Sequence, residues 1–174
     1  MRIETERLIL RSIREGDEKA LADMAKDGSF SELGFDSDCP KWIDEWIEEA
    51  VKLSDADDPG ADYICNVICL KEDGRVIGSL GSTYYDDLDK IGICYGIGAE
   101  YRRHGYASEA LQAYLEYFFG HYDEDELIAT ILDDNVASWK TIERSGFMLS
   151  DKGLYKDKYD AVERLYRFYT VKRK

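Results

Sequence analysis

The sequence contains little proline, and nothing in it marks a boundary between domains. Among 174 residues there are two prolines, no stretch rich in proline or in glycine and serine separates two apolar regions, and no internal repeat is found. Because 44% of the residues are hydrophobic, the chain has enough apolar material for one compact core. We therefore predict a single domain over residues 1–174.

Long apolar runs are also missing. No run approaches the roughly 20 residues that a membrane-spanning helix needs. The charged N-terminal residues are not followed by the apolar core of a secretory signal. The sequence thus predicts a cytoplasmic protein without a membrane partner.

Histidine is scarce, which bears on metal binding. His104 and His121 are the two histidines, and no zinc-like ligand spacing connects them to the cysteines. Four cysteines lie in or beside apolar runs: Cys39, Cys65, Cys69 and Cys94. We predict buried free thiols and no metal site.

Positive charge is in deficit, since the net charge is −14. A general nucleic-acid-binding protein normally carries a basic surface, so we expect no nucleic-acid partner. The acidic balance suits a cationic substrate such as an amine, a polyamine or a basic peptide end. It is explained equally well as a surface that keeps the protein in solution.

Apolar and β-prone patterns predict seven strands and four helices. The strands are expected at 8–13, Tyr63–Leu70, Val76–Tyr85, Lys90–Ile97, 127–132, 147–155 and 161–169. The helices are expected from Asp17, as a capping residue, to about 27, then from Pro40 to about 51, at 107–118 with an end at Gly120, and at 135–145. Asp73-Gly74 predicts a tight turn within an antiparallel meander. This order indicates a mixed α+β fold rather than a doubly wound parallel sheet.

The segment Arg102-Arg103-His104-Gly105-Tyr106-Ala107 precedes the helix expected at 107–118. A helix N-terminus with a glycine and a small residue can accept a phosphate on its backbone N–H groups. An ordinary turn glycine explains Gly105 in isolation. A dinucleotide fingerprint is excluded because Tyr101 replaces its last glycine, and the Gly-Lys-Ser/Thr of a Walker loop is absent.

Three motifs in order resemble the GNAT superfamily of N-acetyltransferases, and most closely its RimJ/RimL branch, which acetylates N-termini of ribosomal proteins. The first is the segment Thr5-Glu6-Arg7-Leu8-Ile9-Leu10-Arg11. The second is Tyr101 to Leu111, and the third is Asn135-Val136-Ala137-Ser138-Trp139 with Glu143-Arg144-Ser145-Gly146-Phe147. Agreement of three motifs argues against the turn-glycine interpretation.

The resemblance implies a three-layer fold, with a mostly antiparallel sheet of about seven strands that splays between Lys90–Ile97 and 127–132. It also implies acetyl-CoA as co-substrate. Its pantetheine arm would lie along Gly96, Ile97 and Gly98, and Asn135 would contact it or cap its own helix. The pyrophosphate would bind at Arg102, Arg103, His104, Gly105, Tyr106, Ala107 and Ser108.

The implied reaction is direct attack of an amine on a thioester, without a covalent enzyme intermediate. Ser138 is the candidate that protonates the departing thiolate and contacts its sulfur, with Tyr95 and Tyr101 as further candidates. A nucleophilic role for Cys94 is disfavoured because no histidine neighbours it in the sequence.

Two positions depart from the family pattern. Gly92 stands where an acid often occurs, which leaves Asp86, Asp87 and Glu32 as candidate general bases, each also explained as an exposed loop charge. Gly96 stands where a large aromatic residue is frequent, and it would widen the acceptor side or soften the strand.

We predict an acetyl-CoA-dependent N-acetyltransferase that acts on a cationic amine, either a protein N-terminus or a polyamine or other small amine. The acceptor side is expected at the acidic segments 29–54 and 151–160. A non-catalytic acyl-CoA sensor and a purely structural or partner-binding domain are the alternatives. The oligomeric state, monomer or homodimer, is left open.

Overall fold

The structure, a computed structural model, describes the whole chain except residues 27, 29 and 158–159, and the side chain of Glu32 also lies outside the description. Within the described part the α-helices are α1 (Glu18–Ala25), α2 (Ile43–Ala56), α3 (Tyr106–His121) and α4 (Val136–Arg144). Short 3-10 turns are η1 (Ser31–Leu33), η2 (Cys39–Lys41) and η3 (Ala99–Tyr101). None of the described helices is long and apolar enough to cross a lipid bilayer.

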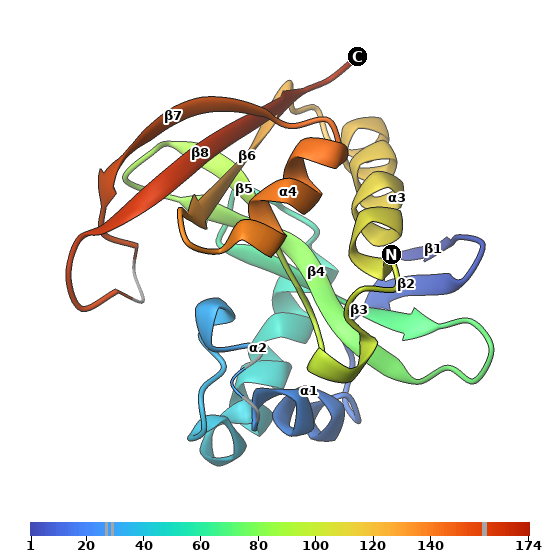
Figure 1. Cartoon of the computed structure of the whole chain (residues 1–174). Coiled ribbons are helices and arrows are strands. Elements are labelled where there is room, and N and C mark those ends of the chain that lie inside the picture. The colour runs from blue at the N-terminus through green and yellow to red at the C-terminus, as the bar shows by residue number, and fades with distance from the viewer. Residues whose placement is uncertain (27, 29, 158–159) are drawn as a thin grey trace.

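One sheet runs through the molecule (Figure 1). Its strands are β1 (Arg2–Glu4), β2 (Leu8–Ser12), β3 (Tyr63–Leu70), β4 (Val76–Tyr85), β5 (Lys90–Ile97), β6 (Glu126–Leu132), β7 (Met148–Tyr155) and β8 (Arg164–Lys172). Their order is β1-β2-β3-β4-β5-β6-β8-β7, and every neighbouring pair is antiparallel except β5 and β6. The mixed α+β class and the mostly antiparallel sheet are thereby confirmed.

The described sheet has eight strands, so the expectation of seven was one too few. The additional strand β1 has three residues and pairs with β2, where Ile3 lies opposite Leu10. Such a short, charged segment carries no periodicity of its own. The last strand is also displaced from 161–169, because Val171 pairs with Leu127 of β6. Both differences come from pairing partners that are distant in sequence.

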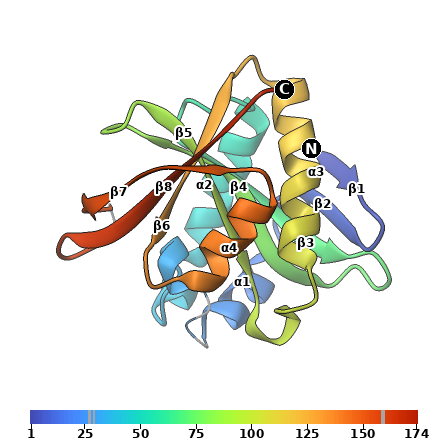
Figure 2. The same cartoon turned by 45° about the horizontal axis from the view of Figure 1, so that its top comes forward.

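Strand β3 separates two apolar cores because its alternate residues point to opposite faces. Ile68 packs with α3 and α4, whereas Val67 packs with α1 and α2. Figure 2 shows α3 and α4 next to each other on one face of the sheet, consistent with the contacts between them. The sheet is therefore covered on both faces by pairs of helices.

The predicted local signals vary in outcome. The tight turn is confirmed, since Gly74 has φ +73° and donates its N–H to Leu70 O at 2.9 Å. Asp17 does precede α1, but its side chain makes no capping bond. Instead its carboxylate accepts two 2.7 Å hydrogen bonds from Arg11 and a 3.0 Å bond from Arg14 N. The partly buried guanidinium of Arg11 replaces the helix N–H groups as the partner of Asp17, because a charged bidentate pair is the stronger interaction.

The splay between β5 and β6 creates the space for a site. These two strands are parallel and share one registered pair, Gly92 opposite Ile128. Beyond that pair β5 continues along β4, with Tyr95 opposite Leu80 and Gly96 opposite Ser79. The cleft described below opens where β6 no longer follows β5.

Candidate active site

The loop before α3 is shaped to leave the helix N-terminus open. Gly105 occupies the N-cap position with φ +82°, and Arg103 has φ +66°. Because the N-cap residue is a glycine, it supplies no capping side chain. The first N–H groups of an α-helix have no partner within the helix, and the helix dipole adds partial positive charge there. An anion is thus favoured at the N–H groups of Tyr106, Ala107 and Ser108.

A cluster around Arg7 fixes the loop. Arg7 donates from Nη1 to His104 O at 2.9 Å and from Nε to Glu109 Oε2 at 2.7 Å, and its guanidinium lies 4.7 Å from the centre of the Tyr106 ring. Glu109 Oε1 accepts from Thr5 Oγ1 at 2.6 Å. Partial burial alone would raise the pKa of Glu109, but the hydrogen bonds from Thr5 and Arg7 lower it.

Sequence reasoning found the segments of this cluster separately but missed their contact. Thr5 and Arg7 belonged to the first motif, and Glu109 to the second. The residues that pair are far apart in the sequence, with a separation of 102 positions between Arg7 and Glu109. The co-occurrence of Thr-x-Arg with a glutamate in the first turn of α3 is the signal that could have indicated it.

The two predicted catalytic residues are neighbours. Tyr95 lies on the side of β5 that faces α4, and its Oη lies 2.9 Å from Ser138 Oγ and donates to Ser138 O at 3.0 Å. Asn135 caps α4, because its Oδ1 accepts from Ser138 N at 3.1 Å. Of the two roles left open for Asn135, the cap is therefore present, and it holds Ser138 in the first turn of the helix.

Gly96 does not widen the acceptor side. A Cβ at this position would lie 2.7 Å from Leu33 Cδ1 and 3.3 Å from Phe30 Cε1. The turn η1 therefore fills the space that a side chain would take. A hydrogen bond holds the end of β5 in place, since Arg102 Nε donates to Ile97 O at 3.0 Å.

A cleft of about 1820 Å³ joins these parts. Twelve of the predicted site residues are among those that line it: Tyr95, Gly96, Ile97, Tyr101, Arg102, Arg103, Gly105, Tyr106, Ala107, Ser108, Asn135 and Ser138. Gly98 and His104 are not. Gly98 faces Met24, and the His104 ring stacks on Tyr106 with Nδ1 3.2 Å from Tyr101 O. The cofactor and catalytic roles of all these residues stay predictions.

The other half of the cleft is aromatic and acidic, and it draws on both expected acceptor segments. Trp46 stacks on Tyr63 with ring centres 5.7 Å apart, and Phe35 lies edge-on to Trp46 at 4.8 Å. Tyr63 Oη donates to Glu49 at 3.3 Å, and Asp160 also lines the cleft. Positions 29 and 158–159 of these segments lie outside the described residues. That these aromatic residues form a wall of the cleft was not predicted from the sequence.

The structure does not place the described candidates for a general base, Asp86 and Asp87, in the cleft. Asp86 and Asp87 are exposed and do not line the cleft, and Asp87 accepts from Tyr155 Oη at 3.3 Å. The Glu32 side chain lies outside the described part. A Cβ at Gly92 would collide with the Tyr85 ring, so a tyrosine fills the place of the missing acid.

Tyr85 points toward β6 from the end of β4. Its Oη lies 3.0 Å from Thr130 Oγ1. Burial raises the pKa of Tyr85 well above its usual value, so this phenol stays protonated at neutral pH. A neutral phenol can donate a hydrogen bond in the cleft but is no base.

The four cysteines are thiols outside any disulfide, as predicted. Cys39 and Cys69 are buried, whereas Cys65 and Cys94 are partly exposed and line the cleft. Burial raises the pKa of the Cys65 thiol to about 12, which makes a thiolate nucleophile unfavourable there. Within the described residues, no group of three or more histidine, cysteine, aspartate or glutamate side chains could hold a metal ion.

Comparison with known proteins gives a consistent result. A family model described as an acetyltransferase (GNAT) domain matches residues 7–148. The N-acetyltransferase YnaD of Bacillus subtilis (strain 168) is 28% identical over 148 residues, which are 84% of this chain and 82% of that protein.

Solved structures of similar fold cover nearly the whole chain. The acetyl transferase from Salmonella typhimurium that modifies the N-terminal serine of a 50S ribosomal subunit protein is 16% identical, with a TM-score of 0.80 over 98% of this chain and 97% of that one. The ribosomal α-N-protein acetyltransferase RimL, in complex with coenzyme A, is 15% identical, with a TM-score of 0.81 over 99% and 98%. At these identities the likeness establishes the fold.

Proposed function

Because the chain belongs to the acetyltransferase (GNAT) family, we propose that it transfers an acetyl group from acetyl-CoA directly to the primary amine of a cationic acceptor. The coenzyme A in the RimL complex and the N-terminal serine modified by the Salmonella enzyme support a thioester donor and an amine acceptor. The residues that line the cleft of this chain further support the proposal.

The residues around the start of α3 fit a pyrophosphate. Gly105, with φ +82°, precedes the first residues of α3, and these residues, Tyr106, Ala107 and Ser108, line the cleft. Their N–H groups have no side-chain cap at the N-cap position. Exposed Arg103 adds positive charge beside them. Two phosphate groups can accept hydrogen bonds there without displacing any side-chain cap.

The reaction needs little from the protein beyond position and proton transfer. Acetyl-CoA supplies an activated acyl carbon. The amine reacts in its neutral form, after its ammonium has given a proton to water. Its nitrogen forms the new C–N bond and loses a second proton to water, the C–S bond breaks, and the thiolate requires a proton. Ser138 donates that proton, and the Tyr95 hydroxyl, 2.9 Å away, replaces it. A positioned donor of this kind accelerates proton transfer by about 10²-fold or more.

The acceptor is a cation because of what lines the other half of the cleft. The faces of Trp46 and Tyr63 can attract an ammonium group, and Glu49 beside them adds negative charge. Asp157 and Asp160 line the same cleft from the segment before β8. A protein N-terminus, a polyamine or another small amine would meet this surface as the charged ammonium.

The observation that carries the proposal is the placement of the Tyr95–Ser138 pair in one cleft with both the α3 N-terminus and the aromatic wall. The test is release of free thiol from acetyl-CoA with a panel of amines, read also by mass spectrometry of the products. Spermidine, an N-terminal serine peptide and a neutral-chain amine of similar length form the panel. Equal turnover of cationic and neutral-chain amines at low salt would refute the choice of a cationic acceptor.

A non-catalytic acyl-CoA sensor is the second candidate, and Tyr85 is the observation that favours it. This neutral phenol fills the position where an acid often serves as base. The same assay decides between the two. Stabilisation by acetyl-CoA in a thermal-shift experiment, with no turnover on any amine, would establish the sensor.

A further inference from the structure

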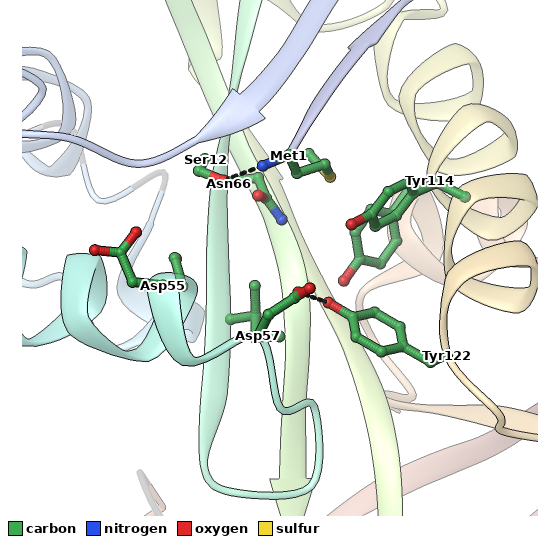
Figure 3. Close-up of a pocket in the computed structure, with 10 residues that line it drawn as sticks. Met1, Ser12, Asp55, Asp57, Asn66, Tyr114 and Tyr122 are labelled. Atoms are coloured by element: carbon green, nitrogen blue, oxygen red, sulfur yellow. Dashed lines mark hydrogen bonds between the residues drawn. The ribbon is translucent and has the colours of Figure 1, made fainter.

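A second cavity, separate from the cleft wall that carries Tyr95 and Ser138, lies between the end of α2, strand β3 and helix α3. Its volume is about 200 Å³. Figure 3 shows Asn66 pointing into it from β3, with Tyr114 and Tyr122 on one side and Asp57 below. Nothing in the proposed acetyl transfer uses these residues.

Asn66 is the reason to regard this cavity as a site. The residue has no exposed surface, and neither its Oδ1 nor its Nδ2 has a hydrogen-bond partner among the described residues. A buried amide without partners is costly, since it loses its bonds to water. The residue opposite Asn66 on the neighbouring strand does not pair with its amide, because Ser12 Oγ accepts instead from Met1 N at 2.7 Å. An amide that both donates and accepts is therefore aimed at open space.

The charges around the cavity select the sign of the ligand. Asp57 and Asp55 line it, and the one cationic group among the described residues that line it is the Met1 α-ammonium, which donates to Ser12 Oγ at 2.7 Å. The two carboxylates outnumber this ammonium. Asp57 is also the C-cap of the 14-residue helix α2, where the helix dipole adds partial negative charge. Tyr122 Oη donates to Asp57 Oδ1 at 2.5 Å and His121 Nε2 lies 2.6 Å from Oδ2, which fixes this carboxylate at the rim.

The size of the cavity and its hydrogen-bonding groups indicate which class of ligand fits. A space of 200 Å³ corresponds to roughly six waters at about 30 Å³ each, or to a molecule of about six non-hydrogen atoms. Tyr114 and Tyr117 supply aromatic walls that can attract a cation. Asn66 Oδ1 can accept from an ammonium, and Nδ2 can donate to a hydroxyl.

We propose that the Asn66 cavity binds a small amino alcohol, with its ammonium between Asp57 and the tyrosine rings and its hydroxyl on the Asn66 amide. The proposal does not depend on acetyl transfer and is tested by binding alone. The probe is 4-amino-1-butanol, which has six non-hydrogen atoms. Its matched controls are 1,4-butanediol, which lacks the charge, and 4-hydroxybutanoate, which reverses it.

Binding is measured by isothermal titration calorimetry on the full chain, and the site is located by a crystal structure with the probe. The aminobutanol is expected to bind at least tenfold more tightly than the diol or the acid. Asn66→Leu, with the same number of side-chain heavy atoms, is expected to weaken binding at least tenfold, whereas Ser150→Ala, an exposed change on β7, changes it less than twofold. Trp46→Ala is measured in parallel to detect binding in the acceptor half of the cleft. If Asn66→Leu does not fold, Asp57→Asn at the exposed rim is expected to weaken binding at least threefold.

Three results would overturn the proposal. The first is binding that depends on Trp46 and not on Asn66, which would place the amine in the acceptor half of the cleft. The second is equal or tighter binding of the diol or the acid with the same dependence on Asn66. The third is no binding of any probe, with water as the occupant of the cavity in the crystal. None of these results depends on whether the protein acetylates anything.

Discussion

The hydroxyl oxygens of Tyr95 and Ser138 lie 2.9 Å apart, although the two residues are 43 positions apart in the sequence. The contact connects the end of β5 to the first turn of α4. It lies on the face of the sheet against which α3 and α4 pack. It makes the two hydroxyls a unit, so their contributions to catalysis should be coupled.

Ser138→Ala is expected to lower kcat by about 10²-fold and to leave the KM for acetyl-CoA within about threefold, because it removes a proton donor and little binding surface. Tyr95→Phe should have a similar effect, and the double variant should be little worse than either single one. Ser150→Ala, which changes an exposed hydroxyl of β7, serves as the control. Multiplication of the two single effects would show that the hydroxyls act independently.

Gly105→Ala is expected to raise the KM for acetyl-CoA about tenfold and to reduce stability by about 1–2 kcal/mol. The reason is the φ of +82°, which an alanine adopts only with strain. Steady-state kinetics and urea unfolding measure the two effects. Gly120→Ala, at a helical position of α3 with open space around it, should instead stabilise by up to about 1 kcal/mol. Unchanged KM in the Gly105 variant would separate this loop from cofactor binding.

Gly96→Ala is expected to destabilise the protein by about 1 kcal/mol, because the new Cβ would lie 2.7 Å from Leu33 Cδ1, at the movable end of its side chain, and 3.3 Å from Cε1 of the buried Phe30. Adding Leu33→Ala should restore part of the loss by removing the colliding atom. The control is Gly153→Ala on β7, where a Cβ meets nothing within 4 Å. Thermal unfolding of the three variants and the parent checks the order of stability, and no rescue by the second change would contradict this packing.

Glu109→Gln should show a stability loss that depends on pH. The pKa of Glu109 is below its ordinary value of 4.5, since hydrogen bonds from Thr5 and Arg7 outweigh the effect of burial. A carboxyl with a lowered folded pKa stabilises the fold above its unfolded pKa and loses this contribution as the pH falls through the folded pKa.

The variant is therefore expected to be less stable than the parent by about 1–2 kcal/mol at pH 7, with a difference that shrinks as the pH falls below the ordinary value of 4.5. Denaturant unfolding across this pH range measures it. Glu116→Gln, an exposed change on the same helix, should show no such trend. A constant difference at all pH values would mean that the charge of Glu109 is not what matters.

Glu49→Gln is expected to raise the KM for a cationic amine about fivefold, with the KM for acetyl-CoA unchanged, because one rim charge contributes modestly to attraction. The effect should fade at high salt. Glu48→Gln, one position away on α2 and outside the cleft wall, is the control. A shift of both KM values would place Glu49 in a structural role instead.

Local patterns were sufficient for the elements that carry strong periodicity. Strands β3, β4 and β5 begin and end where the alternation and the Asp73-Gly74 turn predict. The three-residue strand β1 and the displaced β8 were not predictable in this way, because each is defined by its partner strand. Asp17 shows the same limit, since a local cap was outcompeted by Arg11.

The sequence by itself determined the fold class, the family motifs and the phosphate-type loop, because these depend on periodicity and on residues adjacent in the chain. Tertiary structure alone decided that Arg7 and Glu109 fix this loop, that Leu33 fills the space beside Gly96, and that Asn66 faces an open cavity. These relationships join residues far apart in sequence. Their energies arise from packing and hydrogen bonding across the sheet, which no local pattern records.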